Sequence, residues 1–133
     1  MIKELGELLG NIIVFLYVLT ILNYILKFIN KKYLHLLKKN DKLHSIYMKF
    51  MKFIIRNHKL FGILTVFFIL LHFYIQFTTR GLSITGLIAA TIMLLQVLLG
   101  IYGSKTKRKN KTWLVLHRFI SILLLIAILI HIN

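Results

Sequence analysis

The sequence of 133 residues contains no cysteine and no proline, and only 3 acidic residues accompany 18 lysines and arginines. The absence of cysteine excludes disulfides, thiolate metal sites, iron–sulfur clusters and covalently attached c-type haem. Because carboxylates are so scarce, histidine is almost the only side chain left that could hold a metal. The absence of proline allows long helices without internal breaks.

Apolar residues dominate what is present. They make up 59% of the chain, and the mean hydropathy is +0.82. A water-soluble domain is nearer half apolar, and one of this size could not bury so many Leu, Ile and Phe side chains around one core. The net charge of +15 lies between apolar runs, so we expect no nucleic-acid partner. The composition excludes a soluble globular enzyme and predicts a protein whose main contact is membrane lipid.

Four apolar segments have close to the roughly 20 residues that a helix needs to cross a bilayer core. They run from about Leu5 to Ile29, His58 to Thr79, Leu82 to Gly103, and Trp113 to Ile132. Four lone strands could not close a barrel, so helices are expected. Glu4 and Glu7 argue against a cleaved signal peptide at the start. We therefore predict one all-α domain, residues 1–133, folded as a transmembrane four-helix bundle with up-down topology.

Basic residues predict how the bundle is oriented, because cytoplasmic loops of membrane proteins are enriched in lysine and arginine. The loop between the second and third segments holds only Arg80. The other two loops are strongly basic: Lys31, Lys32, Lys38, Lys39, Lys42, Lys49, Lys52 and Arg56 lie in the first, and Lys105, Lys107, Arg108, Lys109 and Lys111 in the last. We expect a multi-pass protein of the cell membrane with both termini outside, so that the second and fourth spans are parallel.

The first basic loop has a helical pattern of its own. Lys49, Lys52 and Arg56 share one side, and the apolar side is formed by Ile46, Tyr47, Phe50, Met51, Ile54 and Ile55. This pattern predicts a basic interfacial helix between spans one and two that lies on anionic lipid. A docking face for an acidic electron-transfer partner is the alternative.

Four of the six histidines lie in the second and fourth segments, at a repeated spacing. His58 and His72 are 14 positions apart, and so are His117 and His131. A left-handed bundle has about 3.5 residues per turn, so both histidines of one helix face the same neighbour. Along the axis they stand about 21 Å apart. Because the two spans are expected to be parallel, His58 should meet His117 on the cytoplasmic side and His72 should meet His131 on the outer side.

Two facing imidazoles at each level are the axial ligand set of a b-type haem iron, so we predict two haems b. Histidines within spans also serve as hydrogen-bonding contacts between helices, and His58 and His131 lie near span ends. His72 lies several residues inside its span, where an ionisable group is costly without a partner. The duplicated spacing favours the ligand interpretation. For His35 and His44, which lack it, we expect solvated or interfacial positions.

Glycines and cations complete the predicted site. Gly86 and Gly100 are also 14 positions apart and could let the edge of a haem approach the backbone of the third span, as could Gly62; simple helix packing is the alternative. Gly6, Gly10 and Gln96 are expected to be packing residues. Cations should meet the haem propionates. The candidates are Arg118 and either Arg56 or Lys59 at the inner haem, and Arg80 at the outer one, although Arg56, Lys59 and Arg80 are also ordinary span-end anchors.

The runs HKLFGILTVFFILLH, from His58, and WLVLHRFISILLLIAILIH, from Trp113, resemble the haem-binding helices of ferric-reductase-like transmembrane proteins and of dihaem cytochromes b. The resemblance covers about the last 75 residues and leaves the first span and the basic loop unmatched. It implies that the two histidine pairs ligate two haems b. Ferric reductases also carry a flavin and nicotinamide module, and these 133 residues contain no glycine-rich phosphate motif for one. We therefore expect a partner flavoprotein or membrane quinol to supply electrons.

The sequence thus favours transmembrane electron transfer, from a cytoplasmic donor or quinol to an acceptor at the outer face. Ferric-reductase-like activity is the specific form that the family resemblance implies, and the sequence assigns no oligomeric state. The alternative is a small four-span transporter or a structural membrane subunit without haem. Small multidrug exporters rely on a carboxylate deep in the first span, whereas Glu4 and Glu7 lie at its outer edge.

Overall fold

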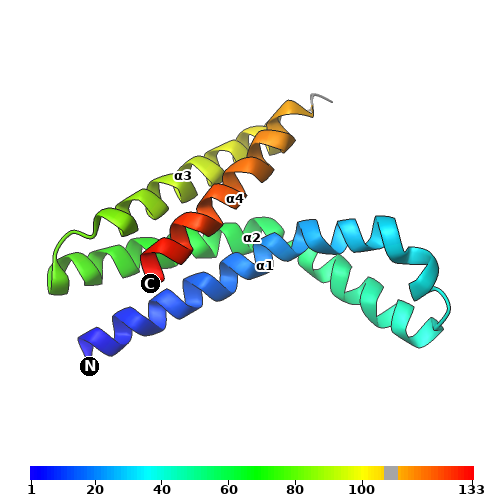
Figure 1. Cartoon of the computed structure of the whole chain (residues 1–133), viewed down its shortest axis with the longest axis horizontal. Helices are drawn as coiled ribbons and strands as arrows, with labels where there is room; N and C mark the ends of the chain where they lie inside the picture. Colours follow the sequence, from blue (N-terminus) through cyan, green and yellow to red (C-terminus); the bar gives the residue numbers. More distant parts are fainter. Residues whose placement is uncertain (107–110) are drawn as a thin grey trace.

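The structure is a computed structural model that describes residues 1–106 and 111–133, and in this part of the chain every regular element is a helix. The helices are α1 (Ile2–Leu37), α2 (Asp41–Arg80), α3 (Ile84–Lys105) and α4 (Thr112–Ile132) (Figure 1). Each is long and apolar enough to cross a membrane. The all-α class and the four candidate spans are therefore as predicted, and they indicate a multi-pass membrane protein. The predicted basic residues Lys107, Arg108 and Lys109 lie outside the described residues.

Local capping signals fix the ends of α2 and α3. The Asn40 side chain accepts a hydrogen bond from the Leu43 backbone N–H at 3.1 Å and so starts α2. Gly81 ends it with a φ of 82°, a conformation that side-chain-bearing residues rarely adopt. Ser83 then accepts from the Gly86 backbone N–H at 3.3 Å and starts α3. The short turn brings the end of α2 beside the start of α3.

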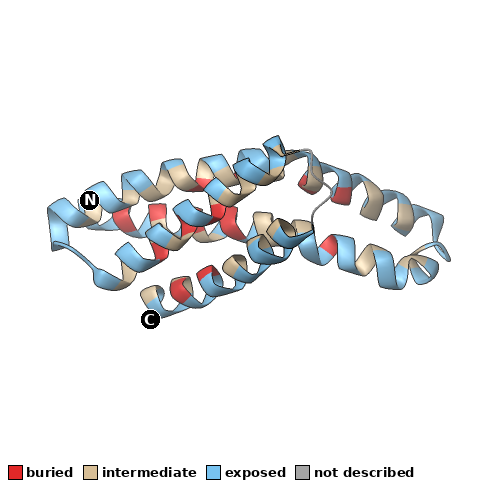
Figure 2. Ribbon diagram, turned by 90° about the horizontal axis from the view of Figure 1, so that it is seen from above, coloured by how far each residue is buried: buried red, intermediate tan, exposed pale blue. Residues whose placement is uncertain are grey.

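The helices form two hairpins. α1 packs along α2, and α3 packs along α4, with fewer contacts between α2 and α3 (Figure 1). Tyr17, Met93 and Leu124 form a small buried cluster that joins α1, α3 and α4. There the Tyr17 hydroxyl donates to the Ser121 carbonyl at 2.5 Å. Most of the helix surface is exposed (Figure 2), as expected for helices that face lipid rather than a water-excluding core.

The predicted separate interfacial helix is wrong in one respect. Residues 46–55 are helical, but they belong to α2, which runs without a break into the second span. The physical reason is that no glycine or proline occurs between Asp41 and Phe61 to end the helix. α1 likewise continues past Ile29 to Leu37, and its Leu26 packs against Met51 and Ile54 of α2. We call residues 27–59, which are the end of α1, the turn after it and the first half of α2, the basic hairpin.

The inner face of the basic hairpin is packed against protein. Met51 and Ile54 of α2 are buried against Leu26 of α1, and Ile54 has no exposed surface. The Tyr47 hydroxyl donates to the Leu26 carbonyl at 2.6 Å. Part of the face that was predicted to lie on lipid is thus covered by α1.

This packing predicts different costs for two isoleucines in the same segment. Ile54→Ala should lower the free energy of unfolding by about 2 to 5 kcal/mol, because it leaves a cavity between α1 and α2. Ile46→Ala, at a site that is 57% exposed, should cost less than about 0.5 kcal/mol. Denaturant titration in detergent measures both. Equal losses would contradict a hairpin packed on its Ile54 side.

Candidate cofactor site between the hairpins

The structure brings four histidines together in two facing pairs. The ring centroids of His58 and His117 lie 6.4 Å apart, and those of His72 and His131 lie 6.3 Å apart. All four side chains are half-buried. Because the order of the pairs is the same along both helices, α2 and α4 run in the same direction. The sequence reasoning placed these four residues in the same two pairs.

The separation of the rings suits a shared metal. An imidazole nitrogen binds a first-row metal at about 2 Å, so two imidazoles on opposite sides of one metal have ring centroids about 6 Å apart. The described residues contain no group of three or more His, Asp or Glu that could hold a metal ion. Each pair therefore offers two imidazole ligands, one from α2 and one from α4.

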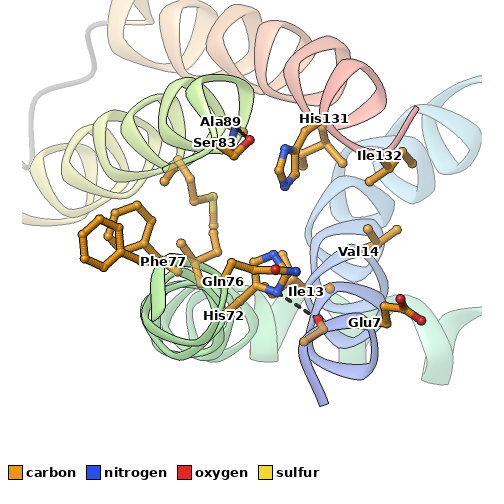
Figure 3. Close-up of a pocket in the computed structure, with 18 of the residues that line it drawn as sticks. Glu7, Ile13, Val14, His72, Gln76, Phe77, Ser83, Ala89, His131 and Ile132 are labelled. Carbon is orange, nitrogen blue, oxygen red and sulfur yellow. Dashed lines mark hydrogen bonds between the residues drawn. The ribbon is translucent and has the colours of Figure 1, made fainter. Parts of the chain in front are cut away.

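In the outer pair, both rings are held by their Nδ1 atoms. His72 Nδ1 donates to the Gly6 carbonyl of α1 at 3.0 Å, the bond drawn as a dashed line in Figure 3. His131 Nδ1 lies 3.0 Å from the Thr85 hydroxyl of α3. The proton on His72 Nδ1 leaves the lone pair of its Nε2 atom available to a metal. Histidines that ligate metals are usually oriented by such a bond from the other ring nitrogen.

In the inner pair, no hydrogen bond of normal geometry holds the Nδ1 atoms among the described residues. These Nδ1 atoms, of His58 and His117, are both buried. His117 Nε2 instead lies 3.3 Å from Nε2 of Gln96, which is only 8% exposed. Gln96 was expected to be a packing residue, yet it contacts a candidate ligand. Its amide at lipid depth was the available signal, because buried polar groups need partners.

Two glycines of α3 make room for two of the imidazoles. A Cβ atom on Gly86 would lie 2.9 Å from His131 Cε1, and one on Gly100 would lie 3.4 Å from His117 Cε1. These two glycines were expected to face the haem edge, but the structure places them against the histidine rings instead. They let α3 approach the rings closely enough to fix their position.

The contacts of Gly6, Gly10 and Gly62 differ from those expected from the sequence. A Cβ atom on Gly10 would lie 3.5 Å from His72 Cε1, although Gly10 was expected only to pack helices. Gly6 supplies the carbonyl that holds His72. Gly62, a predicted contact of the inner haem, has no neighbour within 4 Å of its Cβ position among the described residues. No spacing in the sequence relates Gly6 or Gly10 to His72, because they lie on different helices.

A cavity of about 750 Å³ lies at the level of the outer pair (Figure 3). All four helices line it, and His72 and His131 reach it from α2 and α4. Its size falls within the range of about 300 to 1,000 Å³ that is usual for ligand sites. Apolar side chains such as Ile13, Val14 and Phe77 form much of the wall, with a few polar residues among them. A largely apolar ligand with a small polar edge suits such a wall.

The candidate cations are distributed unevenly. Arg80 lines the cavity, and its Nη2 atom lies 3.6 Å from Oε1 of Glu7, which lines the cavity too. Arg118 instead lies with its Cζ 4.8 Å from the ring centroid of Tyr24, a cation–π contact. Arg56 is exposed on α2, as is Lys59. Arg80 is thus the predicted propionate partner that the structure places beside the described cavity.

Comparisons with protein-family models, curated proteins and solved structures give no match to this chain. The resemblance to dihaem cytochromes b therefore depends on the two histidine-containing runs, from His58 and from Trp113, alone.

The close approach of Gly86 to His131 gives a specific test. Gly86→Ala should displace the His131 ring and lower occupancy of an outer haem at least about threefold, whereas Gly62→Ala should leave it unchanged. Alanine is favoured over glycine within helices by up to about 1 kcal/mol, so neither change should weaken the helix itself. Haem content per chain, measured after purification, checks both. Equal haem content in the two variants would show that the Gly86 contact does not position the ring.

Proposed function

We propose that this chain is a minimal dihaem b membrane cytochrome that transfers electrons across the membrane. His58 with His117 would hold an inner haem, and His72 with His131 an outer one. The observation that carries the proposal is the repeated geometry: two facing imidazole pairs, with centroids 6.4 and 6.3 Å apart, on two parallel helices. The cavity at the outer pair adds a space of suitable size.

The residues around the outer pair would prepare the ligands. The Gly6 carbonyl and the Thr85 hydroxyl hold the two Nδ1 atoms, and Gly10 and Gly86 pack against the rings. Rings that are fixed in this way need little reorganisation when a ligand binds. When bound, a b-type haem supplies one-electron redox chemistry. Histidine on both sides would leave no open position for oxygen, which favours outer-sphere electron transfer.

Charge supports an orientation for the pathway. The basic hairpin adjoins His58, so the His58–His117 pair should be cytoplasmic and both termini should lie outside. A cytoplasmic flavoprotein or membrane quinol would supply electrons, and an acceptor at the outer face would receive them. Ferric-reductase-like activity is the specific form that the sequence resemblance suggests. Reduction of the purified protein by a quinol analogue would separate a quinol donor from a protein donor.

One observation favours a second candidate, a small transporter or structural subunit without haem. Glu7 and Arg80 line the same cavity as His72 and His131, and such groups could handle protons beside a substrate. The two candidates predict different purified proteins. A haem protein is coloured and shows a sharp absorption band on reduction, whereas a haem-free transporter is colourless even after expression with ample haem.

Substitution of single histidines tests the pairing. His72→Leu should remove the outer haem and leave one haem per chain, because one axial ligand is lost. His117→Leu should remove the inner haem in the same way. His44→Leu is the matched control, since His44 lies outside both pairs, and it should retain two. Two haems per chain in the His72→Leu protein would contradict the assignment.

A further inference from the structure

The basic hairpin is the most strongly charged part of the molecule. Residues 27–59 include ten lysines and arginines and a single acidic residue, Asp41. Every one of these cations is exposed: Lys27, Lys31, Lys32, Lys38, Lys39, Lys42, Lys49, Lys52, Arg56 and Lys59. Orientation of the membrane spans requires basic residues near the span ends, but it does not require a folded extension that carries them.

The basic hairpin projects beyond the part of the molecule that holds the cavity. It continues the long axis of the molecule past the ends of α3 and α4 (Figures 1 and 2). α2 has 40 residues, so at about 1.5 Å per residue it is about 60 Å long, twice the thickness of a hydrocarbon core of about 30 Å. Because α2 is longer than the core, its first half extends beyond the hydrocarbon when its second half crosses it.

An apolar stripe is exposed on this projecting segment. Leu43, Ile46, Phe50 and Phe53 follow one another at intervals of three or four residues, which places them on one face of α2. They are 51%, 57%, 45% and 55% exposed, in that order. The neighbouring face of the helix is the one that packs Met51 and Ile54 against α1. Unlike that face, the stripe is uncovered.

Lysines border the stripe. Lys42 lies four residues before Ile46, and Lys49 lies three residues after it and four before Phe53, so both are on its side of the helix. Protein interfaces combine a central apolar patch with a charged rim in this way. A contiguous exposed apolar patch also marks an interaction site. The rim is positive, so the complementary partner surface is acidic.

We propose that this face of the basic hairpin docks an acidic flavoprotein and brings it to the His58–His117 pair at the base of the hairpin. The electron-transfer half of this inference rests on the proposed function. One electron would leave the reduced flavin and one ferric iron held by that pair would become ferrous, with no atom transferred. The docking half needs only the charge and the stripe. Opposite charges would also speed encounter, an effect that salt screens.

Binding of a purified acidic flavodoxin, used as the probe, tests the docking surface directly. The full chain is placed in nanodiscs of neutral phosphatidylcholine, and affinity is measured at low and high salt. The double variant Lys42→Glu/Lys49→Glu should weaken binding at least about tenfold, because it reverses the rim charge. Phe50→Ser should weaken it at least about threefold, which attraction between charges alone does not explain. Lys3→Glu, at the opposite end of α1, is the control and should bind as the native chain does.

The outcomes separate this inference from the proposed function, because binding is measured whether or not haem is present. Native affinity in both hairpin variants would overturn the docking surface. So would protection of residues 43–53 from amide exchange by phosphatidylserine nanodiscs and not by the probe, since the stripe would then face lipid. Binding without reduction of the bound haem by the reduced probe would overturn the electron-delivery role, while the haem assignment is tested by its own spectrum.

Discussion

The arrangement of the two hairpins brings together four imidazoles that stand on apolar helices, where an ionisable ring without a partner is costly. A polar ring in that environment needs a partner, and each of these rings faces another ring across the space between α2 and α4. Two of them are also held by groups on α1 and α3. The two hairpins meet at Tyr17 and Leu124, and at the outer level they stay far enough apart to leave a cavity.

The outer and inner histidine pairs differ in how firmly their rings are held and in the space beside them. At the outer level, hydrogen bonds to the Nδ1 atoms orient the rings, both rings line a cavity, and Arg80 and Glu7 line the same cavity. At the inner level, the rings stand at nearly the same separation, but Gln96 contacts the Nε2 atom of His117. A metal bound to His117 Nε2 would therefore have to displace the Gln96 side chain. The outer pair is the better-formed site.

The features of this structure that follow from local sequence patterns could be predicted from the sequence. Apolar runs gave the four spans, and the 14-residue spacing gave the histidine pairs, because helix length and period are local properties. The contacts of Gly10 with His72 and of Gln96 with His117 join different helices, and no spacing in the sequence encodes them. The continuity of α2 was missed for a different reason. An amphipathic pattern predicts a helix but does not show whether lipid or another helix covers its apolar face, and here α1 covers part of it.

The most direct test of the central claim is the haem stoichiometry of the native chain, purified after expression with ample haem. We expect two b-type haems per chain, both six-coordinate and low-spin, because each of the proposed pairs His58–His117 and His72–His131 would supply both axial ligands. A chain that binds no haem, or that binds haem only in a five-coordinate, high-spin form, would contradict it.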